Sequence, residues 1–241
     1  MNIRSDLVEA HDRVWRSISQ AGTWLTAEQR VAVLQASRAA LTCVLCDERK
    51  NALSPNAVQG VHESVPGVLS REAIDVVHKL VTDPGRITRA WVNGCLSNGL
   101  TDTEYVEIAG LTSAIVVVDT FHAALGLPLR DVPVPRPGEP VRNRPTTARK
   151  EDSYVPMIPQ DGLQGDYSNL YDLTSRFVPN VHRAFSLVPE ATRCADDLMA
   201  SHYFPYEQVP SYTDAEHDYA INKMQMELLA SRVSIHNDCF Y

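Results

Sequence analysis

Apolar residues recur at helical spacing from the start of the chain. In residues 6–20 they fall on one side of a helix, at Leu7, Val8, Ala10, Val14, Trp15 and Ile18. A second helix is predicted over residues 27–40, which are rich in Ala, Val, Leu, Gln and Arg. Thr26 precedes it as an N-cap, and Glu28 and Gln29 follow in its first turn, close to a capping-box arrangement. The beginning of the chain is therefore predicted to be helical.

Helical patterning continues over the next hundred residues. Three further helices are predicted at about residues 70–82, 87–97 and 102–125. Turn-forming residues separate these segments, which supports their boundaries. Thr101 or Asp102 is expected to cap the third of these helices, and Gly126 followed by Pro128 is expected to end it.

The chain changes character after Pro128. Six prolines come in quick succession, at Pro128, Pro133, Pro135, Pro137, Pro140 and Pro145. We interpret residues 130–167 as an extended linker, which contributes no core and wraps a neighbouring surface. Helical patterning resumes near Ser168, again at residues 188–201, and in a last element that starts near Asp214. Few segments alternate as strands do, so the predicted fold class is all-α.

The composition limits the class of protein. A chain of 241 residues is long enough for one large domain or two modest ones. Its net charge of −8, without a basic stripe, argues against nucleic-acid binding. The longest apolar run, residues 114–118, is far too short to span a bilayer, and the N-terminus lacks the apolar core of a signal peptide. We therefore expect a cytoplasmic protein that has no membrane partner.

Cys43 and Cys46 form a Cys-x-x-Cys pair, which places both thiols on one side of a helix. If Thr42 caps that helix, Cys43 lies in its first turn, where free N–H groups and the helix dipole favour the thiolate. A redox pair, a metal site and two inert buried thiols all remain open. Zinc would need two further ligands, and neither a second Cys-x-x-Cys nor a His-x3-His lies at zinc-finger spacing. The candidate partners are His62 and His122.

A second cysteine pattern lies at the end of the sequence. Glu227 and Cys239 are twelve positions apart, and two residues follow the cysteine. Together with the run from Gly99 to Glu104 and with Gly126-Leu127-Pro128, these residues resemble the AhpD-like (carboxymuconolactone decarboxylase) superfamily. Its motif is a glutamate, eleven residues, Cys-x-x-Cys, three residues and a histidine. On this resemblance, residues 1–129 form a complete repeat, 130–167 the linker and 168–241 a truncated second repeat.

The resemblance implies a thiol-dependent peroxidase that reduces hydroperoxides, draws on a thiol reductant and assembles as a homo-oligomer. In this family the second cysteine is peroxidatic, the first resolves it, and the glutamate and histidine relay protons. Cys239 then corresponds to the resolving thiol and Glu227 to a relay acid, while the peroxidatic position and the relay histidine are absent. Because some members carry selenocysteine at the second position, we expect a UGA codon after codon 241. A UAA or UAG codon there would contradict this hypothesis.

Both motifs set physical conditions on such chemistry. About 18 Å of straight helix would separate Glu227 from Cys239, so the relay needs a helix break, which the N-cap residues at positions 237 and 238 favour. The first repeat departs from the family motif, with Val31 at the glutamate position and Lys50 at the histidine position. Glu28, His62 and His122 are the candidate substitutes.

Three functions remain open from the sequence. The first is a thiol- or selenol-dependent peroxidase that acts through the cysteine motifs and needs no cofactor. The second is a decarboxylase-like lyase, in which His122, three residues after Asp119, acts as general acid and base in a pocket between helices. The third is a non-catalytic protein that binds a metal such as zinc at Cys43 and Cys46, or that serves in assembly.

Overall fold

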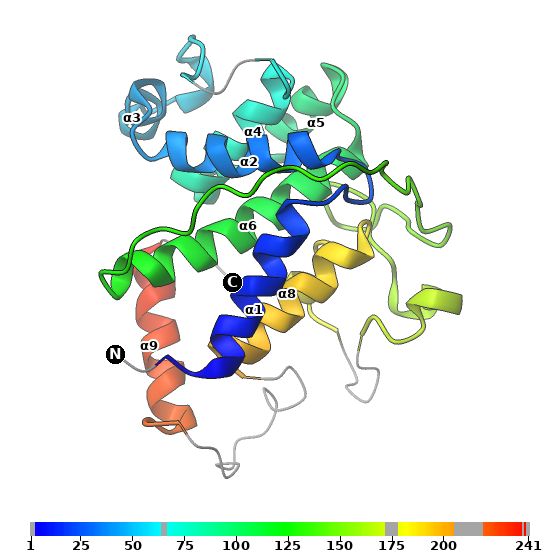
Figure 1. Cartoon of the computed structure of the whole chain (residues 1–241). Coiled ribbons are helices and arrows are strands. Elements are labelled where there is room, and N and C mark those ends of the chain that lie inside the picture. Colours follow the sequence, from blue (N-terminus) through cyan, green and yellow to red (C-terminus); the bar gives the residue numbers. More distant parts are fainter. Residues whose placement is uncertain (1–2, 64–66, 172–177, 205–218, 238, 240–241) are drawn as a thin grey trace.

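A computed structural model describes residues 3–63, 67–171, 178–204, 219–237 and 239. Helices form the architecture of these residues (Figure 1). Among them, extended backbone pairs through an isolated bridge between Arg149 and Met157, outside any named strand. The predicted all-α fold class is confirmed.

The α-helices of the first half match the predicted segments closely. They are α1 (Ser5–Ile18), α2 (Ala27–Ala40), α3 (Val44–Asn51), α4 (Arg71–Thr82), α5 (Arg89–Ser97) and α6 (Asp102–Ala124). The later helices are α7 (Asn180–Arg183), α8 (Pro189–His202) and α9 (Lys223–His236). Short 3₁₀ turns lie between them at η1 (Pro55–Ala57), η2 (Pro84–Arg86), η3 (Gln160–Gly162) and η4 (Gly165–Tyr167).

The starts of α2 and α6 follow the sequence signals. Thr26 and Gln29 form a reciprocal capping box at α2, and Thr101 forms one with Glu104 at α6. In each box the threonine side chain accepts from a backbone N–H of the first turn, and the partner side chain accepts from the cap residue's N–H. Four backbone donors that lack helical partners are satisfied in this way.

Helix α6 is the central element of the fold. It contacts α2 and α4 on one side and α8 and α1 on the other (Figure 1). Its buried residues include Val106, Ile108, Leu111, Ile115 and Val118. Helix α6 is long and apolar enough to cross a membrane by length and composition, but half of its most apolar window is buried inside the molecule. A core helix of a soluble protein has these same properties.

Residues 130–167 are mostly extended, and their first part follows the α1–α2 loop. The backbone N–H groups of Arg136 and Arg142 donate to the backbone carbonyl oxygens of Ser19 and Thr23, respectively, both at 2.8 Å. The expectation that this segment contributes no core is wrong. Ile158 is completely buried and packs with Leu170, Tyr171 and Val178 in a cluster of its own. Apolar residues after the last proline of the run therefore form core without forming a helix.

Two predicted boundaries in the last third differ from the structure. No α-helix forms near Ser168 among the described residues: residues 165–171 fold into a short 3₁₀ helix and turns. The next described helix is α7. The last helix starts at Lys223, after a capping box between Asn222 and Gln225, and residues 219–222 are not helical. Asp214, the expected start, lies outside the described residues.

Candidate metal centre

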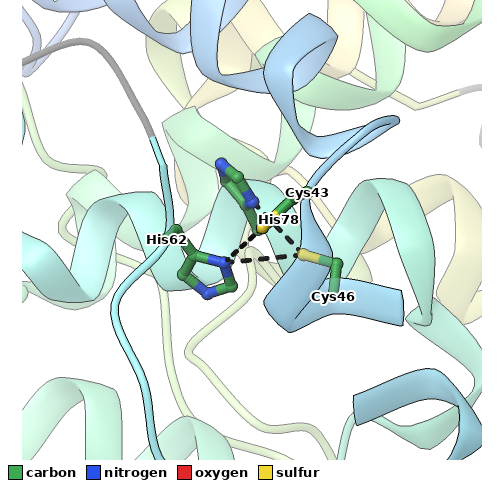
Figure 2. A group of neighbouring side chains, drawn as sticks. All are labelled: Cys43, Cys46, His62 and His78. Carbon is green, nitrogen blue, oxygen red and sulfur yellow. Dashed lines mark hydrogen bonds between the residues drawn. The ribbon is translucent and has the colours of Figure 1, made fainter. Parts of the chain in front are cut away.

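The Cys-x-x-Cys pair lies where the chain turns from α2 into α3. Cys43 is the N-cap of α3 and has extended backbone angles, and Cys46 lies in the first turn. The predicted cap, Thr42, is therefore wrong by one residue. The Thr42 hydroxyl lies 3.5 Å from the carbonyl of Ala39 at the end of α2, and the α3 N-terminus has no side-chain cap. With Cys43 at the cap and Cys46 one turn later, the two sulfurs lie near each other at the start of α3 (Figure 2).

Two histidines complete the cluster. His62 comes from the segment that precedes α4, and His78 lies on α4 itself. The Nδ1 atom of His62 lies 3.4 Å from the sulfur of Cys43 and 3.5 Å from that of Cys46, and the Nδ1 atom of His78 lies 3.2 Å from the Cys46 sulfur. One ligand atom from each of the four residues lies within 4.8 Å of all the others. Figure 2 shows the four side chains pointing towards a common centre.

The three S···N distances are close to the corresponding edges of a zinc tetrahedron. With Zn–S bonds of about 2.3 Å and Zn–N bonds of about 2.0–2.1 Å, a tetrahedral ion has S···N edges of about 3.5 Å. The cluster is also closed to solvent. Cys43 and Cys46 are each 5% exposed, the His62 side chain is 5% exposed and His78 is completely buried. The four residues therefore suit a metal ion that is enclosed by protein ligands.

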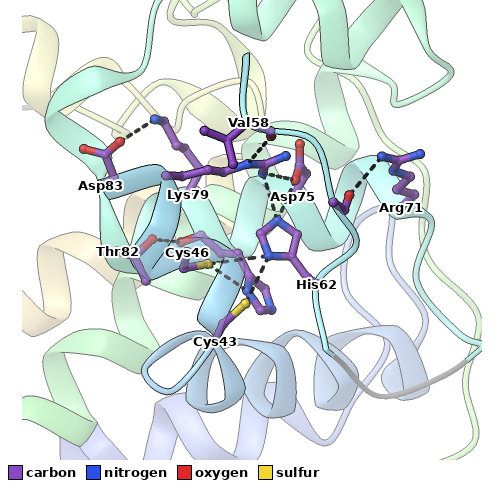
Figure 3. A network of polar contacts seen from close by, with 12 residues as sticks. Cys43, Cys46, Val58, His62, Arg71, Asp75, Lys79, Thr82 and Asp83 are labelled. Atoms are coloured by element: carbon purple, nitrogen blue, oxygen red, sulfur yellow. Dashed lines mark hydrogen bonds and ion pairs between the residues drawn. The ribbon is translucent and has the colours of Figure 1, made fainter. Parts of the chain in front are cut away.

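Asp75 and Arg49 hold His62 in this orientation. The Nε2 atom of His62 donates to Oδ1 of Asp75 at 2.6 Å (Figure 3). Nη1 of Arg49 donates to the same oxygen at 2.8 Å. The Arg49 Nε atom also donates to the carbonyl of Val58 at 3.2 Å. Because Asp75 accepts from Nε2, the other ring nitrogen is left to face the sulfurs.

The electrostatics of the metal-free cluster follow from these contacts. Burial lowers the pKa of His62, but hydrogen bonds to Asp75 and to both thiols outweigh it and raise the pKa to about 10. Burial likewise raises the pKa of Asp75, and its bonds to His62 and Arg49 prevail and lower it to about 2. At Cys43, burial opposes and the His62 hydrogen bond favours the thiolate, with a lowered pKa as the net result. Without metal, the cluster favours a thiolate beside a protonated His62.

His78 differs from His62 in its surroundings. Burial, followed by the positive charge of His62, lowers the pKa of His78 to about 4, so its ring is neutral. Its Nε2 atom is buried and has no hydrogen-bond partner among the residues that the structure describes. A neutral imidazole whose Nδ1 faces a sulfur is the form that binds a metal.

The lobe that carries the two cysteines has little core of its own. Cys43, Leu45 and Cys46 form a small separate cluster, with Val58 packed against it. The guanidinium of Arg86 adds hydrogen bonds to the carbonyls of Arg49, Lys50 and Ala52 at the end of α3. Polar contacts, which include the Cys-His cluster and the Arg49–Asp75 pair, therefore supplement this small core in attaching the lobe to α4.

His122, the second histidine expected beside the cysteines, lies elsewhere. Its ring is 5.8 Å from that of His11, and its Nδ1 atom donates to the carbonyl of Pro128 at 2.7 Å. The pairing of His122 with Asp119 that an acid–base role would use is also absent from the described contacts. Arg38 holds the Asp119 carboxylate through Nε at 2.8 Å and Nη2 at 3.0 Å. Asp119 and His122 do lie about one turn apart on α6, but the Asp119 carboxylate pairs with Arg38 instead.

The residues of the second motif lie on and after α9. Glu227 is on that helix, where a hydrogen bond to it, together with burial, raises the pKa of Tyr203. Helix α9 ends at His236 with Asn237 as its C-cap, so the predicted helix break falls at this point. Cys239 is exposed and its N–H donates to the carbonyl of Ser234 at 2.9 Å. Asp238 and the two residues after Cys239 lie outside the described part of the chain.

Sequence reasoning found three of the four clustered residues and missed His78. The signal was a histidine on the apolar face of α4, directly after the buried Val76 and Val77. A polar ring on a buried face needs partners, and Cys46 supplies one. Asp75, on the same helix, was also missed, because nothing in the sequence indicates that it faces the segment before α4.

Comparison with known proteins adds no name to this site. No family model matches the chain, and neither the curated proteins nor the solved structures contain a match. The class of protein is thus defined by its fold and its cluster: an all-α chain with a buried group of two cysteines and two histidines.

Proposed function

We propose that Cys43, Cys46, His62 and His78 bind one Zn²⁺ ion in a closed tetrahedral site. The observation that carries this proposal is the convergence of two sulfurs and two Nδ1 atoms at the spacing of a zinc tetrahedron. Two thiolates and two imidazoles are a ligand set that favours zinc over the harder magnesium and calcium ions. Four protein ligands leave no position for substrate, which makes the role of the metal structural.

The fold gives such a metal a task. The lobe formed by α3 and residues 52–62 has a small apolar core, and small cores are commonly supported by a metal ion. Zinc would join α3 to the loop that carries His62 and to the buried face of α4. The His62–Asp75 hydrogen bond supports this arrangement, because ligating histidines usually donate their other N–H to a carboxylate or carbonyl.

Metal content of the purified chain tests the proposal. We expect about one zinc per chain by elemental analysis, and cobalt substitution should give the intense visible absorption of a tetrahedral thiolate site. Cys46→Ser and His78→Ala should each abolish stoichiometric binding. Cys194→Ser and His122→Ala are the matched controls, since both residues lie outside the cluster. A wild-type chain that binds no zinc after reconstitution, or a Cys46→Ser chain that binds it fully, overturns the proposal.

The second candidate function is a thiol peroxidase at the same cysteines, as the AhpD-like resemblance implies. The observation that favours it is the Cys–His–Asp arrangement, in which a histidine contacts both thiols and a carboxylate orients the histidine. Here one thiolate attacks the hydroperoxide and releases an alcohol, leaving a sulfenic acid. The second thiol condenses with it to a disulfide and water, and an external thiol restores the pair.

Turnover of hydroperoxide by the metal-free chain distinguishes the two candidates. A peroxidase should consume cumene hydroperoxide with dithiothreitol, and Cys46→Ser should lose that activity while Cys239→Ser keeps it. Zinc addition should then inhibit, because the metal occupies both thiolates. Stoichiometric zinc without turnover in either state leaves only the structural metal site.

The resemblance also implies a homo-oligomer, and the composition favours a cytoplasmic location; both stay proposals. Supporting the homo-oligomer, α9 exposes apolar side chains on several sides, at Met224, Leu228, Leu229, Val233 and Ile235. Several exposed large apolar side chains on one helix often mark a protein–protein contact surface. Light scattering coupled to size-exclusion chromatography measures the mass directly, and a monomer of 26.8 kDa would contradict this expectation.

A further inference from the structure

A cavity of about 650 Å³ lies between α1, α6 and α8, and none of the four clustered ligands lines it. Small-molecule sites commonly have volumes of about 300–1,000 Å³. The walls are largely apolar and include Val14 of α1, Leu111 of α6, and Val188 and Ala191 at the start of α8. The cavity thus has the size and surface of a ligand site.

A buried ion pair forms one side of this cavity. The Glu107 side chain is 2% exposed, and its Oε1 atom accepts from Nη1 of Arg30 at 2.5 Å. Its Oε2 atom accepts from the backbone N–H groups of Trp24 at 2.6 Å and Leu25 at 3.3 Å. Three donors from two directions fix the carboxylate, so the pair does not rearrange when a ligand enters.

Gly22 allows the ion pair to lie against the backbone. A Cβ atom at this position would stand 1.9 Å from Oε1 of Glu107 and 2.4 Å from Nη1 of Arg30. Only a residue without a side chain leaves room for both atoms. Gly22 is thus needed both for the ion pair and for the loop between α1 and α2, which lines this side of the cavity.

Arg30 has donors to spare. A guanidinium carries five N–H groups. Three have acceptors: Nε donates to the Ser17 carbonyl at 3.2 Å, Nη2 to the Ser17 hydroxyl at 3.4 Å, and Nη1 to Glu107. Among the described residues no acceptor is recorded for the other two. Because Arg30 lines the cavity, an oxygen atom of a ligand can take these positions.

The charges around the cavity cancel in pairs. Arg13 donates to both carboxylate oxygens of Asp197 at 2.8 Å, and Arg193 pairs with Glu190. With Arg30 and Glu107, three cations thus face three anions. An ionised ligand would meet no unbalanced opposite charge, whereas an uncharged one with an oxygen acceptor would lose little on leaving water.

We propose that this cavity binds an uncharged, predominantly apolar small molecule whose carbonyl or hydroxyl oxygen accepts hydrogen bonds from Arg30. The proposal is independent of the metal site, because the two groups of residues do not overlap.

Benzophenone is a suitable probe, because it is an uncharged ketone that also crosslinks to nearby C–H bonds on irradiation. Diphenylmethane has the same shape without the oxygen, and diphenylacetate adds a negative charge. The three are titrated against the full chain by saturation-transfer NMR. We expect benzophenone to bind about tenfold more tightly than diphenylmethane, since a hydrogen bond to a charged group contributes about 1.5 kcal/mol. Diphenylacetate should bind more weakly than benzophenone.

Photolabelling locates the bound ketone by peptide mass spectrometry. Labels should map to α1, α6 and α8 around Val14, Leu111 and Val188. Cys194→Phe, which places a large side chain in the cavity wall, should remove the labelling, and Cys239→Phe should not. Labels elsewhere on the surface, equal affinities of benzophenone and diphenylmethane, or tighter binding of diphenylacetate would each overturn the proposal. The wild-type label map decides the question even if Cys194→Phe fails to fold.

Discussion

Asp75 accepts a hydrogen bond of 2.6 Å from Nε2 of His62, and this contact sets which ring nitrogen faces the two sulfurs. The neutral tautomer with its proton on Nε2 has its lone pair on Nδ1, 3.4 Å from Cys43 and 3.5 Å from Cys46. Arg49 shares the same carboxylate oxygen and fixes Asp75 in turn. The Nδ1 atom is thereby oriented towards the sulfurs before any ion arrives, and zinc binding would displace the proton that it carries in the metal-free cluster.

Replacing Asp75 tests whether this orientation matters. Asp75→Asn keeps the size of the side chain but removes the charge that holds the Nε2 proton. We expect zinc affinity to fall about 10–100-fold, as loss of a carboxylate partner of a ligating histidine typically does. Competition with a chromophoric chelator measures the dissociation constant.

Asp119→Asn is the control for that experiment. Asp119 lies on α6, outside the cluster, and forms a partly buried pair with Arg38 of α2. This substitution should change zinc affinity by less than the error of the titration. Equal affinities for the wild type and Asp75→Asn would show that Asp75 merely pairs with Arg49.

The Arg30–Glu107 pair predicts a severe effect of Gly22→Ala. The added Cβ would lie 1.9 Å from Glu107 Oε1, so the carboxylate has to move away from its donors. Overpacking of this kind typically costs about 1–3 kcal/mol, and we expect the free energy of unfolding to drop by roughly that amount. Urea denaturation monitored by circular dichroism measures it.

Gly94→Ala is the matched substitution. Gly94 lies within α5, and a Cβ there meets no atom within 4 Å. Alanine should stabilise the chain by about 0.5–1 kcal/mol, because glycine is the poorer helix former. If Gly22→Ala proved as harmless as Gly94→Ala, the ion pair would contribute little to stability.

The sequence predicted the helices better than it predicted what lies between them. Helix α1 carries apolar residues at helical spacing, and α2 and α6 begin with local capping boxes, which are all short-range signals. Residues 155–158 follow a proline-rich segment and have no helical period, yet Ile158 is completely buried. Its partners Leu170 and Tyr171 come later in the chain, and such tertiary packing leaves no mark at fixed spacing.

The sequence predicted three of the four ligands of the candidate site and missed the fourth for a similar reason. A Cys-x-x-Cys pair at a helix start is a local motif, and the position of Cys43 at the α3 N-cap required only one correction. His62 and His78 each follow the previous ligand by sixteen positions, which is not the histidine spacing of a zinc finger. The packing of α3 on α4 brings them together, whereas the sequence alone offered His122 on the same footing as His62 and contained no motif that includes His78.

His11 and His202 join α1 to α8 and make stability depend on pH. Their Nε2 atoms lie 2.8 Å apart, and His11 is 2% exposed. Burial, then the charges of His202 and His122, lowers the pKa of His11 to about 4, and burial also lowers that of His202. Arg130 and Asp12 face His11 as well, with opposite effects. Both rings are therefore neutral in the folded chain at pH 7.

The sign of the pH effect follows from the number of protons bound. Between pH 6.5 and about 4 the unfolded chain protonates His11 while the folded chain does not, so stability falls as the pH falls through this window. The loss from His11 approaches about 3 kcal/mol at the lower end. His11→Gln should flatten this part of the stability curve, and His236→Gln, at an exposed position on α9, should leave it unchanged. Parallel curves for wild type and His11→Gln would contradict this assignment.

Removing the metal should loosen one lobe and leave the rest of the fold intact. The N–H of Asp47, which donates to the Cys43 carbonyl in the first turn of α3, reports on the lobe, while the amides around Ile108 report on the core. Because the lobe has only a small core, chelation with a dipicolinate excess should speed exchange of the α3 amides at least about tenfold. Amides in the middle of α6 should be unaffected.

Hydrogen–deuterium exchange read by peptide mass spectrometry measures both groups of amides in one sample. The Cys46→Ser chain, which should bind no metal, should show no response to the chelator. Unchanged α3 exchange in the wild type, with zinc removal verified, would mean that the metal does not hold this lobe on α4.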